Sequence, residues 1–367
     1  MTSTPDDNTA SAAEALDLPG LQKSVERCLR EFLATKEQAA SRLHLPPQAA
    51  RSLRSFLDAG GKRLRPLLCA VGWYAAGGHG PVPEAVVRAA SALEMFHAFA
   101  LVHDDIMDRS DTRRGHPTLH RALARQYADR TPDATAEHLG TGAAILVGDL
   151  ALCWSDELLH SADIPADRLR AVRHLSDLMR EEAMYGQYLD LLAPTTPAHD
   201  IRTPLTVIRY KTAKYTCERP LHIGAALAGA GPTVLRACTA FALPLGEAFQ
   251  LRDDLLGVFG EPDRTGKSRL DDLREGKRTV LLALTYRRAD RDQLRTLHEL
   301  VGRHDLTDHD ADRIRTVIVD TGAREAAERM IRQCHDRAEG ALEGTLFPFP
   351  AVQALRHIAH RAAYRCA

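Results

Sequence analysis

Two groups of aspartates stand at the ends of long apolar segments of this sequence. The first, H-D-D-I-M-D, contains Asp104, Asp105 and Asp108, and the second, Q-L-R-D-D, contains Asp253 and Asp254. Carboxylates within one helical turn repel one another, and the C-terminal end of a helix adds to the repulsion. Each group therefore needs a cation. Magnesium, held by one or two carboxylates and completed by phosphate oxygens and water, is the natural one.

An isolated D-D-x-x-D group has an ordinary alternative, a solvated acidic helix end. The segments that lead into the two groups weaken that alternative. Residues 83–107 and 232–259 are apolar on almost all sides, which is typical of helices at the centre of a bundle. Because a buried helix has no reason to end in unpaired acids, we expect the two groups to face each other across a cavity and to clamp a metal–diphosphate.

Basic residues surround the acidic groups along the chain. Of the 48 lysines and arginines, only seven are lysines. Four of these seven lie in short polar motifs: Lys62 in G-G-K-R-L-R-P, Lys211 in R-Y-K-T-A, and Lys267 and Lys277 in G-K-S-R-L-D-D-L-R-E-G-K. An ammonium is a compact donor to phosphate that a guanidinium does not replace. Chance placement on solvated helix faces is the alternative, and the clustering favours a diphosphate site.

Two other kinds of site are excluded. The segment G-E-P-D-R-T-G-K-S looks like a nucleotide phosphate loop, but five residues separate Gly260 from Gly266 where the P-loop has four. No strand pattern precedes it. A nucleic-acid partner is not expected either, because the formal net charge is only −1.

The elements that must position these residues are helices. Almost every segment from Leu18 onward shows a 3.6-residue period, and no segment alternates as a strand does. We therefore predict an all-α fold: a disordered tail at 1–17, then a single helical domain at 18–367, long enough for one large core. Helices are expected near 20–42, 47–58, 64–76, 83–107, 117–129, 135–160, 165–192, 203–229, 232–259, 277–289, 291–303, 308–320, 322–343 and 350–364.

The cysteines and the apolar runs indicate where the protein works. Seven cysteines are scattered without a C-x-x-C pair, so reduced thiols are expected rather than disulfides. The first residues show no cationic start with an apolar run, and no stretch reaches the ~18 apolar residues of a membrane span. We predict a soluble, cytoplasmic protein without a membrane span.

Taken in order, the motifs resemble those of the trans-isoprenyl diphosphate synthases, or polyprenyl synthetases, and most of all geranylgeranyl diphosphate synthases. The resemblance runs from about Gly60 to Lys277. It rests on G-G-K-R-L-R-P, E-M-F-H-A-F-A-L-V-H-D-D-I-M-D-R-S-D-T-R-R-G, G-Q-Y-L-D, Y-K-T-A, F-Q-L-R-D-D and G-K…D-D-L-R-E-G-K. It implies a single large helical bundle around a central cavity, usually a homodimer. It also implies three magnesium ions between an allylic diphosphate and both acidic groups.

The resemblance assigns roles to individual residues. The metals would be bound by Asp104, Asp105, Asp108, Asp253 and Asp254. Isopentenyl diphosphate would be held by Lys62, Arg65, His97 and Arg114. The allylic diphosphate would be held by Arg113, Lys211, Thr212, Gln250, Lys267 and Lys277. The residues expected to be catalytic are Asp104, Asp105, Lys211 and Asp253.

Two segments depart from the family pattern. The second acidic motif commonly ends in a third aspartate, where this chain has Gly257. The segment after Lys267 reads Ser268-Arg269-Leu270, where family members often carry a proline and a glycine. The first departure removes one carboxylate from the metal site. Because magnesium keeps several waters, we expect water to fill that place and metal binding to be weakened rather than lost.

The implied reaction is head-to-tail condensation of isopentenyl diphosphate with dimethylallyl, geranyl or farnesyl diphosphate, and it needs no nucleophilic side chain. A terpene cyclase would carry an asparagine in its second metal motif, whereas the only asparagine here is Asn8, in the predicted tail. A non-catalytic subunit of a heteromeric synthase would be expected to lack the first aspartates or the lysines. Both are present.

Product length is expected to depend on the helical turns just before Asp104. Each turn rises ~5.4 Å, roughly one isoprene unit. By resemblance, bulky residues at the fourth and fifth places before the first aspartate stop growth at fifteen carbons. Here these places hold Ala100 and Phe99, with Phe96 as a deeper stop. The pattern predicts twenty-carbon geranylgeranyl diphosphate. A farnesyl or longer product is the alternative, as is a cavity floor formed by another helix.

Overall fold

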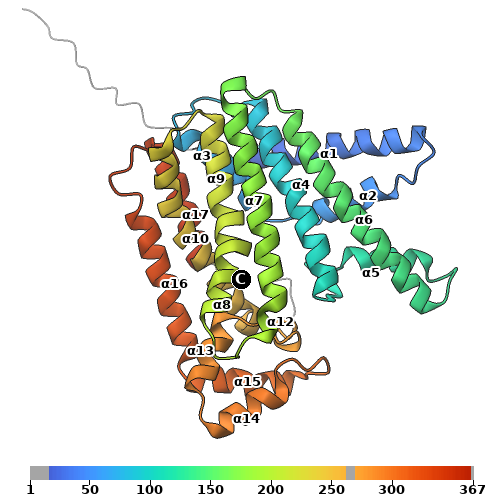
Figure 1. Cartoon of the computed structure of the whole chain (residues 1–367), viewed down its shortest axis with the longest axis vertical. Helices are drawn as coiled ribbons and strands as arrows, with labels where there is room; N and C mark the ends of the chain where they lie inside the picture. Colours follow the sequence, from blue (N-terminus) through green and yellow to red (C-terminus); the bar gives the residue numbers. More distant parts are fainter. Residues whose placement is uncertain (1–15, 262–268, 365–367) are drawn as a thin grey trace, which may run out of the picture.

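The computed structural model describes residues 16–261 and 269–364, and most of them are helical (Figure 1). The predicted all-α fold is confirmed. Residues 1–15 of the predicted tail and Lys267 lie outside the described part of the chain. The division into a tail and one domain stays a prediction.

The helices follow one another along the chain with few interruptions. The first half contains α1 (Leu18–Arg42), α2 (Gln48–Asp58), α3 (Leu64–Ala75), α4 (Glu84–Met107), β1 (Thr112–Arg113), β2 (His116–Pro117), α5 (Leu119–Tyr127), α6 (Asp133–His160), α7 (Ala166–Leu192) and η1 (Ala193–Thr195). The second half contains α8 (Arg202–Val207), η2 (Ile208–Glu218), α9 (Arg219–Leu227), α10 (Pro232–Phe259), α12 (Asp271–Arg274), α13 (Val280–Arg288), α14 (Arg291–Leu300), α15 (Asp308–Asp320), α16 (Ala323–Gly340) and α17 (Phe349–Tyr364).

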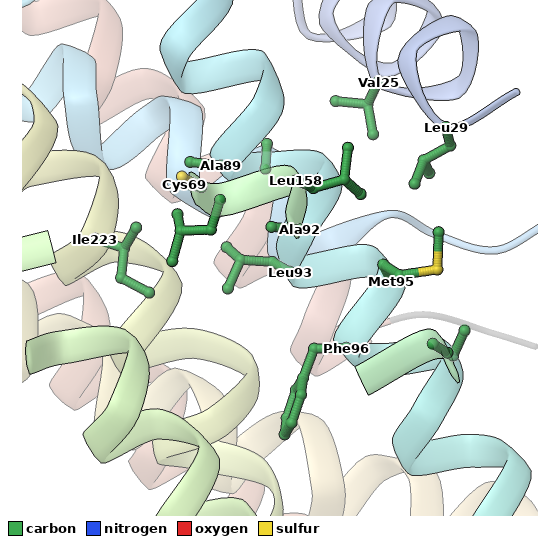
Figure 2. Close-up of a cluster of buried hydrophobic side chains, with 14 of the residues drawn as sticks. Val25, Leu29, Cys69, Ala89, Ala92, Leu93, Met95, Phe96, Leu158 and Ile223 are labelled. Carbon is green, nitrogen blue, oxygen red and sulfur yellow. The ribbon is translucent and has the colours of Figure 1, made fainter. Parts of the chain in front are cut away.

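Helix α4 lies in the core, as its apolar sequence predicts. Met95 and Phe96 are fully buried, in a cluster that draws side chains from four other helices (Figure 2). These side chains are Val25 and Leu29 from α1, Cys69 from α3, Leu158 from α6 and Ile223 from α9. By length and composition α4 is able to cross a membrane, but 67% of its apolar window is buried inside the protein. It is a core helix of the bundle.

The segment 203–229, expected as one regular helix, is divided into α8, the π-helix η2 and α9. A π-helix hydrogen-bonds five residues along the chain and often marks a functional site. Two glycines let neighbouring helices reach its backbone. A Cβ on Gly186 of α7 would lie 2.5 Å from the backbone nitrogen of Lys211, and one on Gly246 of α10 would overlap Ala213 Cα. The backbone that carries Lys211 is therefore held directly between α7 and α10.

A short β-hairpin follows α4, although no strand was expected. In it Thr112 pairs with Pro117 and Arg113 with His116. Strands of two residues are too short to show an alternating pattern, which is why the sequence did not reveal them. Arg114, at the turn, has a φ of 54° in the left-handed region. The hairpin turns the chain back so that its two arginines lie near the end of α4.

The helix expected at 277–289 starts later, at Val280, where the Thr279 side chain accepts a hydrogen bond of 3.2 Å from the Leu282 nitrogen. Before it lies α12, a helix of four residues that was not predicted. Lys277 therefore belongs to the connection between α12 and α13 rather than to a helix. Helices α13, α14 and α15 gather at one end of the molecule (Figure 1).

Candidate active site

The last turn of α4 carries the first acidic group. Asp104 Oδ1 accepts a hydrogen bond of 2.9 Å from Lys211 Nζ, and its Oδ2 accepts one of 3.3 Å from Arg113 Nη2. Asp105 is buried and accepts from Arg113 Nε at 2.7 and 2.9 Å. Asp108 follows the last residue of α4 and caps the C-terminal end of the helix. The π-helix and the hairpin thus supply the cations that this crowded group requires.

The carboxylates of this group differ in how well they are compensated. Burial disfavours the charge of Asp104, but Lys211 and Lys277 outweigh it and hold the pKa of that carboxyl below its ordinary value. Burial raises the pKa of Asp108 to about 6, and the nearby charge of Asp104 adds to the rise. The first group therefore still lacks positive charge at Asp108.

The second acidic group, Asp253 and Asp254, lies near the end of α10. Asp254 is buried and accepts a hydrogen bond of 2.8 Å from Gln250 Nε2. Gln250 Oε1 in turn accepts one of 2.8 Å from Thr212 Oγ1, which joins η2 to α10. Burial raises the pKa of Asp254 to about 7 against the hydrogen bond from Gln250, and the charge of Asp272 adds to the rise. Asp254, like Asp108, therefore has too little positive charge near it to offset its burial.

Lys277 lies near both groups, and Lys211 joins the first group to α7. Lys211 Nζ lies 2.9 Å from Asp104 Oδ1 and 2.6 Å from Asp190 Oδ2 on α7. Burial opposes the charge of Lys277, but surrounding carboxylates, Asp190 first, raise its pKa well above the ordinary value. The charge of Lys277 acts on Asp104 and on Asp254 alike. Asp190 had no predicted role, although it closes the motif G-Q-Y-L-D.

A second set of basic residues lies beside the start of α3. Arg65 Nη2 donates a hydrogen bond of 2.6 Å to Thr216 Oγ1, and the guanidinium carbon lies 4.2 Å from the centre of the Tyr215 ring. His97 Nδ1 lies 3.0 Å from the Tyr215 hydroxyl oxygen. Burial, aided by the charges of Arg65 and Arg114, holds the pKa of His97 well below its ordinary value. His97 is therefore neutral at pH 7.

The loop before α3 and the hairpin meet at this second set. Arg114 donates a hydrogen bond to the carbonyl oxygen of Gly60. Burial lowers the pKa of Arg114, and the charges of Arg63 and Arg65 contribute. Lys62 is exposed, and its Nζ lies 5.8 Å from the centre of the Phe249 ring on α10. The residues predicted to hold isopentenyl diphosphate thus come together from α3, α4 and two loops.

A buried ion pair holds this loop, and its acidic member had no predicted role. Arg63, which is 5% exposed and has a φ of 47°, donates to Glu94 Oε1 at 2.5 Å and to the Leu57 carbonyl oxygen at 2.6 Å. Glu94 is 3% exposed. The sequence did contain a signal for this pair: Glu94 is an acid in an apolar stretch of α4, and a buried acid needs a positively charged or hydrogen-bonding partner.

The donor atoms at the two acidic groups are all carboxylate oxygens, which suits magnesium. Within residues 16–261 and 269–364, no three His, Cys, Asp or Glu side chains lie close enough to hold a metal ion by themselves. Lys211 and Arg113 already occupy part of the first group. The residues therefore fit a magnesium ion that a bound diphosphate completes, rather than a cage formed by protein alone.

Comparison with known proteins decides the family. The sequence pattern described as polyprenyl synthetase matches residues 46–318. The chain belongs to the polyprenyl synthetase family. The predicted assignment to prenyltransferases of this family is confirmed.

Named relatives of this polyprenyl synthetase differ in their products. It is 35% identical over 309 residues to the geranylfarnesyl diphosphate synthase of Aeropyrum pernix, a match that covers 84% of this chain and 90% of that protein. It is 34% identical over 278 residues to the farnesyl diphosphate synthase of Geobacillus stearothermophilus, covering 72% and 86%. The structure matches the geranylgeranyl pyrophosphate synthase of Corynebacterium glutamicum, crystallised with isoprenyl diphosphate and magnesium, with a TM-score of 0.91 and 39% identity. That match covers 95% of this chain and 100% of the other.

The ion pair of Arg63 with Glu94 leads to a stability prediction. In Glu94→Ala, the buried guanidinium of Arg63 loses its hydrogen-bonded carboxylate and keeps only Glu26, 3.8 Å away, so we expect the free energy of unfolding to fall by about 3–5 kcal/mol. Chemical denaturation followed by circular dichroism measures this change. The matched control is Glu84→Ala on the same helix, because Glu84 is exposed and bonds Arg88 at 3.0 Å. The control should change stability by less than about 1 kcal/mol. Equal losses in the two variants would contradict the role of the buried pair.

Proposed function

We propose that this polyprenyl synthetase catalyses the magnesium-dependent head-to-tail condensation of isopentenyl diphosphate with allylic diphosphates, with geranylgeranyl diphosphate as main product. The observation that carries the proposal is that η2 contacts both acidic groups. Lys211 donates a hydrogen bond to Asp104 of α4. Thr212 donates one to Gln250, which in turn donates one to Asp254 of α10. The magnesium named for the C. glutamicum structure supports it. Allylic starters are dimethylallyl, geranyl and farnesyl diphosphate.

The acidic groups and their cations would together hold the allylic diphosphate. The residues that would bind the metal are Asp104, Asp105, Asp108, Asp253 and Asp254. These residues would hold three magnesium ions, the number that the family resemblance implies, and the ions would supply positive charge to the departing diphosphate. The residues that would contact the allylic diphosphate directly are Arg113, Lys211, Thr212, Gln250, Lys267 and Lys277. The hydrogen bonds of Lys211 to Asp104 and of Thr212 to Gln250 support this assignment, because they would orient Lys211, Thr212 and Gln250 before a substrate binds.

The second set of cations would hold isopentenyl diphosphate. Arg65 and Arg114 carry charge, and neutral His97 adds a polar contact without adding to the repulsion between the arginines. Lys62 is exposed at the edge of this set. The electron pair of the broken C–O bond leaves with the allylic diphosphate, and the isopentenyl double bond forms the new C–C bond. The proton then lost goes to the released diphosphate. No side chain of the protein is consumed.

The product would grow alongside α4, away from Asp104 and toward the start of the helix. The Phe99 ring lies 5.2 Å from the Phe96 ring, which in turn lies 5.7 Å from the Tyr215 ring. Phe96 is fully buried, whereas Phe99 and Ala100 are partly exposed. This difference in burial supports the proposal that Phe99 and Ala100 meet the growing chain first, with Phe96 behind them as a deeper stop.

We propose that the protein is a homodimer in the cytoplasm. Large apolar side chains are exposed along two helices that follow each other in the chain, which is unusual for surfaces that face only water. On α6 these are Leu139, Ile145 and Leu146, and on α7 they are Met184, Tyr185, Tyr188, Leu191 and Leu192. A second copy of the chain would cover them. The cysteines of the described residues are free thiols, which suits a reducing compartment.

The metal assignment is tested by removing one carboxylate from each group. Asp104→Ala and Asp253→Ala should each lower kcat by at least ~10²-fold, the scale for losing one electrostatic stabiliser. Chelation of magnesium should abolish turnover of the wild type. The assay is product formation from isopentenyl and farnesyl diphosphate, with circular dichroism to confirm folding. Near-normal rates in either folded variant would contradict the assignment of these aspartates to the metal site.

The same assay tests the alternative function. A wild-type protein that is inactive alone would indicate a non-catalytic subunit of a heteromeric synthase.

Product length is tested at the two residues beside the first acidic group. Ala100→Phe should shift the main product from geranylgeranyl to farnesyl diphosphate, because a second ring narrows the path. Phe99→Ala should give longer products. Mass spectrometry of the products formed with each allylic starter measures both shifts. If both variants keep the wild-type distribution, the floor of the cavity lies on another helix.

A further inference from the structure

Three residues on one face of α7 contact the π-helix η2 and the helix that follows it. Helix α7 packs along both η2 and α9 (Figure 1). Glu182, Gly186 and Asp190 are spaced four residues apart on α7, so they share a face. Asp190 binds the Lys211 ammonium, and Gly186 admits the Lys211 backbone. Glu182 completes this row of residues, and the proposed reaction assigns it no part.

The Glu182 carboxylate accepts three hydrogen bonds from two cations. Lys214 Nζ donates one to Oε1, and Arg219 donates one of 2.9 Å from Nη2 to Oε1 and one of 2.7 Å from Nε to Oε2. None of these three side chains is more than 15% exposed. Burial opposes the charge of Glu182, but the hydrogen bonds from Arg219 and Lys214 lower the pKa of its carboxyl. Hydrogen bonds with charge on both partners are the strong ones.

The two cations stand at different places along the irregular segment. Lys214 lies within η2, three residues after Lys211, and Arg219 is the residue at which α9 begins. Glu182 therefore connects the inside of the π-helix to the point where regular α-helix resumes. Most π-helices are a single turn, whereas η2 covers 11 residues, so contacts from neighbouring helices must hold it. A shift of the chain by one residue would turn Lys211 by about 100° around the helix axis.

A neighbouring acid does not replace Glu182. Glu218 Oε2 lies 3.7 Å from Lys214 Nζ and 3.7 Å from Arg219 Nη2, beyond hydrogen-bond distance. The other oxygen of Glu218 accepts a hydrogen bond of 2.7 Å from Thr239 Oγ1 on α10. The two cations are therefore bonded to α7 through Glu182, while Glu218 connects the same segment to α10.

We propose that Glu182 is a positioning residue for the condensation reaction. By binding Lys214 and Arg219 it fixes the register of η2. That register holds Lys211 at the first acidic group and presents its ammonium to the allylic diphosphate. Glu182 acts only through η2, because it lies eight residues, about 12 Å along α7, from Asp190. The inference rests on the proposed function, which assigns Lys211 to that diphosphate.

The test measures ligand binding by the folded protein, without turnover. Inorganic diphosphate is titrated into the full-length protein at a fixed magnesium concentration and followed by isothermal titration calorimetry. Glu182→Gln keeps the size of the side chain and removes its charge. Its dissociation constant for diphosphate should rise about tenfold, the scale for losing a residue that orients a ligand of a metal site. Loss of a negative charge by itself would strengthen the binding of an anion, so weaker binding indicates a displaced Lys211.

The matched control is Glu181→Gln. Glu181 is the preceding residue on α7 and is exposed. The substitution removes the same charge, and the dissociation constant should stay within about twofold of wild type. Circular dichroism and the thermal unfolding midpoint show that each variant is folded at the temperature of the titration. A purely structural role of Glu182 would lower that midpoint and leave the dissociation constant of the folded protein unchanged.

A double-mutant cycle tests whether Glu182 acts through Lys211. Lys211→Gln should weaken diphosphate binding by itself. Adding Glu182→Gln to Lys211→Gln should then cost less than about twofold, because the residue that Glu182 positions is already gone. If Glu182→Gln does not fold, Lys214→Gln takes its place, since it keeps the pair of Glu182 with Arg219. Its loss should likewise disappear in the Lys211→Gln background.

The outcomes separate this inference from the proposed function. Wild-type affinity in folded Glu182→Gln, or an equal loss with and without Lys211, overturns the positioning role and leaves the diphosphate site intact. If the wild type itself does not bind diphosphate in the presence of magnesium, the proposed site fails and the inference fails with it. Weaker binding that depends on Lys211 supports the inference.

Discussion

Mutual repulsion among buried carboxylates is the constraint on which the rest of this structure depends. The acids of α4 and α10 stand at the ends of apolar helices, where an ionised carboxylate without a partner is strongly disfavoured. The protein meets part of this demand with Lys211, Arg113 and Lys277. The raised pKa values of Asp108 and Asp254 show that the demand is only partly met. A site in this condition favours the binding of a further cation, which agrees with the proposed magnesium–diphosphate site.

The irregular parts of the fold supply the compensating charges. A π-helix carries Lys211 and Thr212, a hairpin of two short strands carries Arg113, and a connection between helices carries Lys277. Regular helices provide the hydrophobic core and the acidic ends, and glycine at 186 and 246 allows α7 and α10 to contact the π-helix closely. The rigid core and the irregular segments thus have separate roles, and the site lies where they meet.

The sequence predicted much of this because the relevant signals are local. Apolar periodicity gave the helices, and an acidic group after a long apolar run identified the ends of α4 and α10. The π-helix could not be predicted, since a change in hydrogen-bond pattern leaves the apolar pattern of η2 nearly unchanged. The pairing of Arg63 with Glu94 and that of Glu182 with Lys214 join residues far apart in the chain. No spacing rule reveals such contacts, and only the folded structure brings them together.

The central claim is that the two acidic groups bind metal together with diphosphate and not before it. Equilibrium dialysis of magnesium against the wild-type protein, with and without inorganic diphosphate, tests this most directly. The account predicts weak binding to the protein alone and binding tighter by about tenfold or more when diphosphate is present. Tight binding of magnesium to the protein alone, with no gain from diphosphate, would contradict it.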